Sequence, residues 1–177
     1  MIASLVGSEM CIRDSLKATF NFNRLQKITN KTNILLKFNG QVAADNLDGG
    51  EQLTLGGPNA VRAYASSEAA GDAGFTTGVE LKRNFFNLPT TLFYDYGQIR
   101  LHKNKWSGWN STNTDLKNKY ALKGWGLSMD VPVFNLFTVQ LSHSRTIKGN
   151  SGIDSDGLDV DGLSWDGRTF ITLSKQY

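Results

Sequence analysis

The sequence predicts an all-β fold, in which an antiparallel sheet forms part of a transmembrane barrel. Three observations support this prediction. Apolar and polar residues alternate with a period of two along almost the whole chain, and no segment has a convincing helical period. The apolar face of the expected strands is large and aromatic, yet the chain supplies no second layer to cover it. The connections alternate between short and long, as they do in outer-membrane barrels.

Seven segments carry the alternating pattern. They are 16–27, 32–42, 74–83, 91–101, 120–131, 134–144 and 168–177. In 32–42, for example, Leu36 and Phe38 share one face and Lys37 lies on the other. We expect the apolar face to be convex and to meet lipid, while the polar face lines a wet lumen. Side chains expected on the convex side include Phe22, Leu36, Val79, Tyr94, Leu127, Val139 and Leu173.

The lengths of the connections orient the sheet. The short connections are 28–31, 84–90 and 131–133, and the long ones are 43–73, 102–119 and 145–167. Short turns are periplasmic and long loops extracellular in bacterial barrels, so the last residue, Tyr177, is expected on the periplasmic side. Aromatic residues near strand ends fit interfacial girdles; they are Phe85, Phe86, Trp106, Trp109 and Phe134. Because a spanning barrel needs about eight strands or more, seven strands predict an open, curved sheet that is the C-terminal part of a larger barrel.

Composition allows this reading and excludes a membrane helix. The chain has 177 residues, 40% of them hydrophobic, and a mean hydropathy of −0.31. No run approaches the roughly 20 apolar residues that a spanning helix needs, whereas barrel strands look soluble by bulk composition. The net charge is +3 and basic residues form no run, so nothing indicates nucleic-acid binding.

Residues 1–15 have a different character from the rest. The segment SEMCIRDS resembles a translated sequencing adapter, and we exclude 1–15 from the fold as an artefact of that kind. The alternative is a genuine short N-terminus. The single cysteine, Cys11, lies in this segment, so residues 16–177 carry no disulfide or thiol chemistry.

The first long connection holds an unusual stretch, GGPNAVRAY. Gly56, Gly57 and Pro58 predict a tight turn before its tip. A loop of about thirty residues is long enough to fold back into a barrel, and loops of this length are usually functional. Arg62 offers a fork of donors that matches a carboxylate, and Asp95 is expected on the lumenal face. We therefore expect Arg62 to dock the loop on Asp95. The alternative is a solvated arginine that never meets this aspartate.

Two motifs in this region resemble those of a known family. Val61, Arg62 and Tyr64 match the VRG(Y/F) motif, and Phe93, Asp95 and Gly97 match FxDxG. The resemblance is to the two-partner-secretion transporters, also called TpsB or haemolysin and haemagglutinin secretion/activation proteins. Ala63 replaces the glycine of the motif. If that position needs a left-handed backbone, which alanine enters at a cost, the tip is strained or altered.

The resemblance implies a fold and a function for the complete protein. Periplasmic domains would precede a sixteen-stranded barrel, of which this chain is the C-terminal seven strands. The barrel would conduct a large unfolded exoprotein, such as a haemolysin or adhesin, across the bacterial outer membrane without ATP. The implied partners are this exoprotein, outer-membrane lipid, and the barrel assembly machinery, which would read the final strand through Tyr177.

Weaker signals support no enzyme, cofactor or metal site. The segment 153–162 resembles a calcium loop but lacks the glutamate that such a loop needs, so a flexible extracellular loop is favoured. His102 and His143 lack partners at metal-ligand spacing. Three alternatives to the transporter remain open: a barrel-insertion factor of the same superfamily, a passive porin-like barrel, and a soluble all-β binding module.

Overall fold

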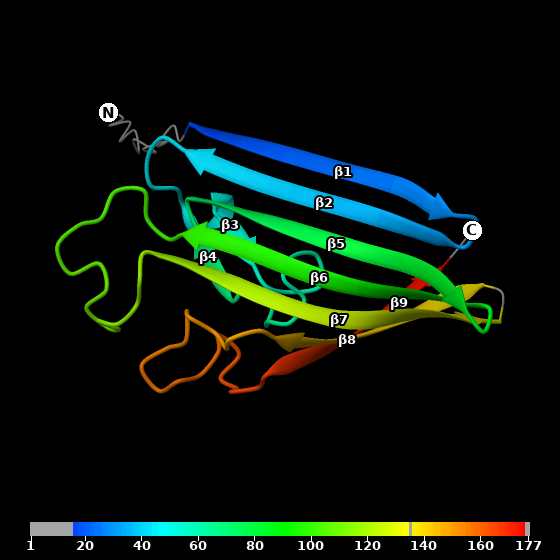
Figure 1. The fold of residues 1–177 in the computed structure, drawn as a ribbon. Coiled ribbons are helices and arrows are strands. Elements are labelled where there is room, and N and C mark those ends of the chain that lie inside the picture. Colours follow the sequence, from blue (N-terminus) through cyan, green and yellow to red (C-terminus); the bar gives the residue numbers. More distant parts are fainter. Residues whose placement is uncertain (1–15, 135, 176–177) are drawn as a thin grey trace, which may run out of the picture.

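The computed structural model describes residues 16–134 and 136–175, and its main feature is one antiparallel sheet of seven strands (Figure 1). The strands follow the order β1-β2-β5-β6-β7-β8-β9, so neighbours in the sheet are consecutive long strands. Their bounds are Lys17–Thr29, Thr32–Ala43, Ala73–Phe85, Leu88–Arg100, Lys119–Val133, Phe137–Thr146 and Gly167–Lys175, respectively. In the described residues β1 and β9 are the two edges. The predicted open, antiparallel sheet is confirmed.

The positions of the short turns account for the differences between the predicted and the observed strand boundaries. The predicted turn 131–133 is wrong, because these residues complete β7. The turn lies further on, where Phe134 has a φ of 51°, a left-handed value that a strand does not accommodate. The strand that was predicted at 134–144 therefore begins three residues later than expected, at Phe137. A similar left-handed pair, Phe86 and Asn87, connects β5 to β6.

The apolar face of the sheet is exposed along its whole width. Register places Leu36 opposite Val79, Val79 opposite Tyr94, and Tyr94 opposite Trp125, so these side chains form one row across four strands. Six of the seven side chains expected on the convex side are among the exposed large hydrophobics, and Val139 is half-buried. The sheet curls away from this face, with β8 and β9 turning beneath β7 (Figure 1). The expected placement is confirmed.

A small second sheet, which the sequence did not reveal, lies in the first long connection. It pairs β3 (Leu53–Leu55) with β4 (Ala69–Gly71), and a single 3₁₀ turn, η1 (Gly49–Glu51), precedes it. Three residues are too few for an alternation to be recognised. The hairpin carries the segment 56–68 onto the concave side of the large sheet. There β3 contacts β5 and β6, and β4 contacts β6.

The buried core lies between this hairpin and the concave face. Its members are Leu55, Val61, Ala63, Tyr64, Ala69, Ile99, Leu101, Tyr120 and Leu122, with Trp109 and Leu116 packed against them. Ile99 and Leu122 belong to the face that was expected to be polar. At the end of the sheet that carries the long loops, this face is therefore apolar and holds the loop in place. Within the described residues, no helix is long and apolar enough to cross a membrane.

Candidate functional site

The arginine of the docked segment meets its predicted partner on the barrel wall. Arg62 Nε donates to Asp95 Oδ2 and Arg62 Nη2 donates to Asp95 Oδ1, both at 2.8 Å. The backbone N–H of Arg62 also donates to Asp95 Oδ2, at 3.1 Å. The two side chains are only 11% and 4% exposed. The contact is therefore a buried, two-pronged ion pair with a third bond from the loop backbone, and the expected docking geometry is confirmed.

A second carboxylate, which the sequence analysis did not assign, completes the charge pattern. Glu80 Oε1 lies 3.0 Å from Arg62 Nη1, and Lys37 and Lys82 contact the same carboxylate at 2.7 and 3.3 Å. Three cations thus face two anions across β2, β5 and β6. Glu80 follows Val79, which was expected on the convex side, so alternation puts Glu80 on the same lumenal face as Asp95, and this shared face was the signal available.

Phe93, the aromatic residue of the second motif, lies beneath the guanidinium. Arg62 Cζ is 3.4 Å from the centroid of the Phe93 ring, close enough for a cation–π interaction. Burial by itself lowers the pKa of Arg62, but the hydrogen bonds and charges of Asp95 and Glu80 outweigh it and raise that pKa. The arginine is thus held in its charged form.

Glycines on three strands leave the space into which the docked segment 56–68 fits. Asp95 pairs with Gly78 on β5 and with Gly124 on β7, so the inward-facing neighbours of the carboxylate have no side chain. A Cβ on Gly97 would lie 2.9 Å from Val61 Cγ2, inside ordinary contact. A Cβ on Gly124 would overlap the Cβ of Ala63. The backbone of the loop can approach the wall only because these positions are glycine.

Ala63 itself is not strained. It is absent from the non-glycine residues of the described chain that have a positive φ. The condition under which alanine would have distorted the tip is therefore not met, and the Ala63 side chain fills the space that Gly124 leaves. Left-handed backbone occurs instead at Gly56 and Gly57, with φ of 85° and 94°, where the predicted turn begins.

Tyr64 joins the tip to the wall and to a second loop. Its hydroxyl donates to the backbone carbonyl of Gly149 at 2.8 Å and also lies 3.1 Å from that of Lys123. Burial raises the pKa of Tyr64 to about 12, so the hydroxyl keeps its proton. Ser144 on β8 donates to the carbonyl of Arg62 at 2.6 Å. Strands β6, β7 and β8 therefore all hold the tip.

A second buried charge network links the docked segment to the last long connection. Arg168 at the start of β9 binds Asp159 at 2.6 Å and Asp161 at 3.0 Å. Asn150 bridges Asp159 and Glu68, and Glu68 also accepts the backbone N–H of Val160 at 3.1 Å. Glu68 lies only four residues after Tyr64. The last loop is therefore fastened to the segment that carries Arg62.

Aspartates of 153–162, the segment that resembles a calcium loop, have partners within the protein. Asp159 is paired with Arg168, while Asp154 accepts the backbone N–H groups of Asp156 and Leu158. In the described ranges, no group of three or more His, Cys, Asp or Glu side chains is arranged to hold a metal. Arg168 has no recognisable signal in the sequence, because its carboxylate partners lie in a loop without periodicity.

The remaining sequence candidates occupy simpler surroundings. The His102 ring packs against Trp106 and Trp109, with centroids 4.6 and 5.7 Å apart. Trp109 is packed on the core, so it is not a girdle residue. His143 lies 2.9 Å from the Thr169 hydroxyl on the outward face. Tyr177 and the segment 1–15 lie outside the described residues, so their assignments stay predictions.

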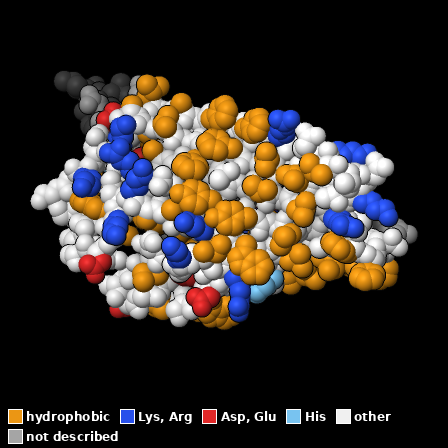
Figure 2. All heavy atoms as spheres, in the orientation of Figure 1, with side chains coloured by type: hydrophobic (Ala, Val, Ile, Leu, Met, Phe, Trp, Pro, Cys, Tyr) orange, Lys and Arg blue, Asp and Glu red, His pale blue; other side chains and the backbone are white. Residues whose placement is uncertain are grey.

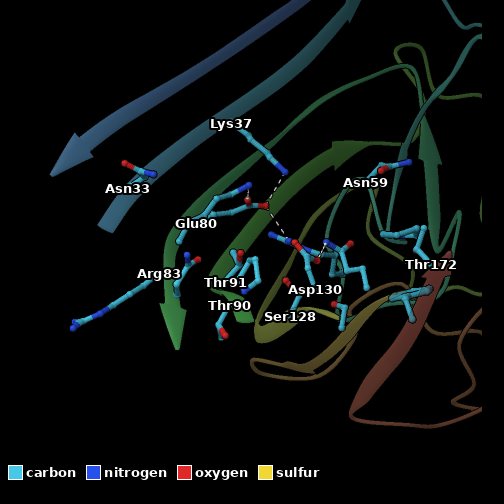
Figure 3. A pocket seen from close by; sticks show the side chains of 18 of the residues that line it. Asn33, Lys37, Asn59, Glu80, Arg83, Thr90, Thr91, Ser128, Asp130 and Thr172 are labelled. Atoms are coloured by element: carbon cyan, nitrogen blue, oxygen red, sulfur yellow. Dashed lines mark hydrogen bonds and ion pairs between the residues drawn. The ribbon is translucent and has the colours of Figure 1, made fainter. Parts of the chain in front are cut away.

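A polar hollow of about 340 Å³ lies beside the ion pair on the concave face. Figure 3 shows Lys37 and Glu80 pointing toward one another at this hollow. Hydroxyl, amide and charged side chains make up most of its lining, including Asn33, Thr90, Thr91, Ser128, Asp130, Gln140 and Thr172. The concave face therefore presents hydrogen-bonding groups to whatever occupies the lumen.

Comparison with known proteins gives a consistent result. A model of the family described as haemolysin secretion/activation protein ShlB/FhaC/HecB matches residues 13–113, a stretch that holds both Arg62 and Asp95. The heme/hemopexin transporter protein HuxB of Haemophilus influenzae strain 86-028NP is 27% identical over 117 residues, which are 63% of this chain and 20% of that protein. HuxB of strain ATCC 51907 / DSM 11121 / KW20 / Rd is 26% identical over 117 residues. The chain thus spans about a fifth of the length of these curated relatives. No solved structure matches it.

Proposed function

We propose that this chain, which belongs to the haemolysin secretion/activation protein family, forms part of the export conduit of a two-partner-secretion transporter in the bacterial outer membrane. The observation that carries the proposal is the buried contact between Arg62 and Asp95, which holds a long loop inside the curve of the sheet. The family is one of transporters rather than enzymes. In the complete protein, the convex face would meet lipid and the concave face would line the pore.

The substrate we propose is a large unfolded exoprotein of the haemolysin or adhesin type. An unfolded chain exposes backbone donors and acceptors, and the hollow beside the ion pair offers many exchangeable hydrogen-bonding partners. Glycine and small polar residues on the concave face leave few apolar sites where such a chain would stall. The docked segment 56–68 occupies part of the curve, so its position sets how much of the lumen is open.

The ion pair favours this function over a passive pore. A porin-like barrel needs no buried arginine on an aspartate of its wall, since a buried charge pair is costly to assemble and to lose. The same pair does not separate export from barrel insertion, because the resemblance assigns the arginine motif to the whole superfamily. The resemblance implies that the number of periplasmic domains in the complete protein would separate those two, with two such domains indicating secretion and about five indicating insertion.

The test is secretion of the cognate exoprotein by the complete transporter carrying Arg62→Ala. We expect secretion to fall while the barrel still assembles, because strand pairing, rather than the loop, holds the sheet together. Channel conductance should persist in altered form. Arg24→Ala is the matched control, since Arg24 pairs with Leu36 and lies on the outward face of β1, away from the docked loop. Normal secretion by Arg62→Ala at normal outer-membrane abundance would contradict the proposed role.

A further inference from the structure

The outward face of the large sheet carries no carboxylate. Register and alternation place Glu80, Asp95 and Asp130 inward, and in the described strands no outward position holds Asp or Glu. The outward cations fall into two groups at opposite ends. Those at the end with the long loops are Arg100, Lys119, Lys123 and Arg145, and those at the end with the short turns are Arg24, Arg83 and Lys175. Figure 2 shows an apolar field with Lys and Arg toward both of its ends.

A row of aromatic side chains lies just inside the group of cations near the long loops. Phe20, Phe38, Phe75 and Tyr96 follow one another across β1, β2, β5 and β6, with ring centroids 5.7–5.9 Å apart. Lys123 Nζ lies 5.7 Å from the centroid of the Tyr96 ring. Aromatic belts of this kind mark the boundary between hydrocarbon and headgroups. The cations are therefore placed at headgroup depth.

An apolar groove of about 320 Å³ opens on this boundary. Val42, Ala73, Phe75, Arg100 and Lys119 are among the residues that line it. Arg100 and Lys119 are direct cross-strand partners. The guanidinium of Arg100 is further held by the backbone carbonyls of two residues in the following loop, at 3.3 and 2.7 Å. The groove thus lies beside two basic residues, and the charge of one of them, Arg100, is held in place.

We propose that this surface binds the phosphorylated glycolipid of the outer leaflet, with an acyl chain in the groove and its phosphate groups on Lys119, Lys123 and Arg145. The inference rests on the membrane orientation in the proposed function. An apolar slot beside a group of cations matches a ligand that has both a hydrocarbon tail and an anionic head. The absence of outward carboxylates means that nothing on the described strands repels phosphate. A wholly polar anion would gain nothing from the aromatic row.

The test measures glycolipid binding to the purified complete transporter by native mass spectrometry, with intact and with dephosphorylated lipopolysaccharide as probes. The triple variant Lys119→Gln, Lys123→Gln and Arg145→Gln is compared with a matched triple at the other end of the same face, Arg24→Gln, Arg83→Gln and Lys175→Gln. We expect the first triple to raise the Kd for intact glycolipid on the order of a hundredfold. The second triple should leave the Kd nearly unchanged.

Two results would overturn the inference: equal affinity for the dephosphorylated probe, or an equal loss in both triples. If the first triple fails to assemble, the comparison of the two probes on the unmodified protein still decides. The outcome is separable from the proposed function, because Arg62 and Asp95 lie on the other face. Loss of glycolipid binding with normal secretion, or the reverse, would show which of the two accounts fails.

Discussion

Gly97 sets how closely the arginine-bearing loop can approach the wall, so Gly97→Ala should lift the loop. The added Cβ would lie 2.9 Å from Val61 Cγ2 and 3.0 Å from Leu55 Cδ2, whereas ordinary contact begins at 3.4 Å. Val61 is fully buried, and its β-branched side chain is restricted in χ1. The loop must therefore move by about 0.5 Å, since a well-packed site does not absorb an extra methyl group.

That shift acts directly on the docking contact. The N–H of Arg62, the next residue, donates to Asp95 at 3.1 Å, and a further 0.5 Å would bring the separation to about 3.6 Å, outside hydrogen-bond range. Overpacking together with a lost bond should cost about 1–3 kcal/mol of docking free energy. The undocked population should rise by about fivefold to 150-fold.

The assay is the rate at which a thiol at position 65 reacts with a maleimide. Ala65 is buried when the loop is docked, so in Ala65→Cys the labelling rate reports the undocked population. All other cysteines of the complete transporter are replaced by Ser, so that the thiol at position 65 is the one labelled. Val61→Ala should relieve the steric clash that Gly97→Ala introduces. The double variant should therefore be less destabilised than the sum of the two single-variant effects. Gly49→Ala, where an added Cβ meets nothing within 4 Å, is the control. Labelling of Gly97→Ala at the unmodified rate, or additive effects with Val61→Ala, would refute this reasoning.

Three further predictions concern the contacts around the loop. Arg168→Ala should cost about 3 kcal/mol by leaving Asp159 buried without its cation, and limited proteolysis should then cut within 150–166. Burial, with the charges of nearby aspartates, raises the pKa of Glu68 above its ordinary value of 4.5. The contact between Glu68 and the loop 150–166 is therefore strongest below pH 4.5 and weakens as the pH rises through the raised pKa. Proteolysis of 150–166 should therefore be slower near pH 4.5 than near neutrality, and Glu68→Gln should remove the difference. Tyr64→Phe should cost about 1–3 kcal/mol by leaving two carbonyls without their donor, which thiol labelling at position 65 would detect.

The strands were predictable because their signal is local. Alternation over ten or more residues identifies a strand and its faces, so Leu36, Val79 and Tyr94 could be assigned to one exposed surface before any contact was known. Arg62 and Asp95 were predictable as a pair because one lies in a distinctive loop motif and the other on a lumenal face. The turns at 28–31 and 84–90 were also predicted, but the turn after β7 was misplaced, because the left-handed backbone at Phe134 has no sequence signature.

The other parts of the site depend on contacts between distant segments. Glu68, Asn150, Asp159 and Arg168 meet only after two loops have folded onto one another, and no period in either loop indicates it. The glycines that make room for the docked segment carried only a weak signal in the sequence. Alternation with Leu127, which was expected on the convex side, puts Gly124 on the lumenal face, but its role is visible only from the Ala63 side chain that lies against it.

The most direct test of the central claim is a double-mutant cycle on secretion, measured in the complete transporter at matched outer-membrane abundance. The four proteins are the unmodified transporter, Arg62→Ala, Asp95→Ala and the double variant. If Arg62 serves export by holding the loop on Asp95, each single variant should lower secretion and the double variant should secrete no less than the weaker single. Losses that multiply in the double variant, or single variants that secrete normally, would contradict the account.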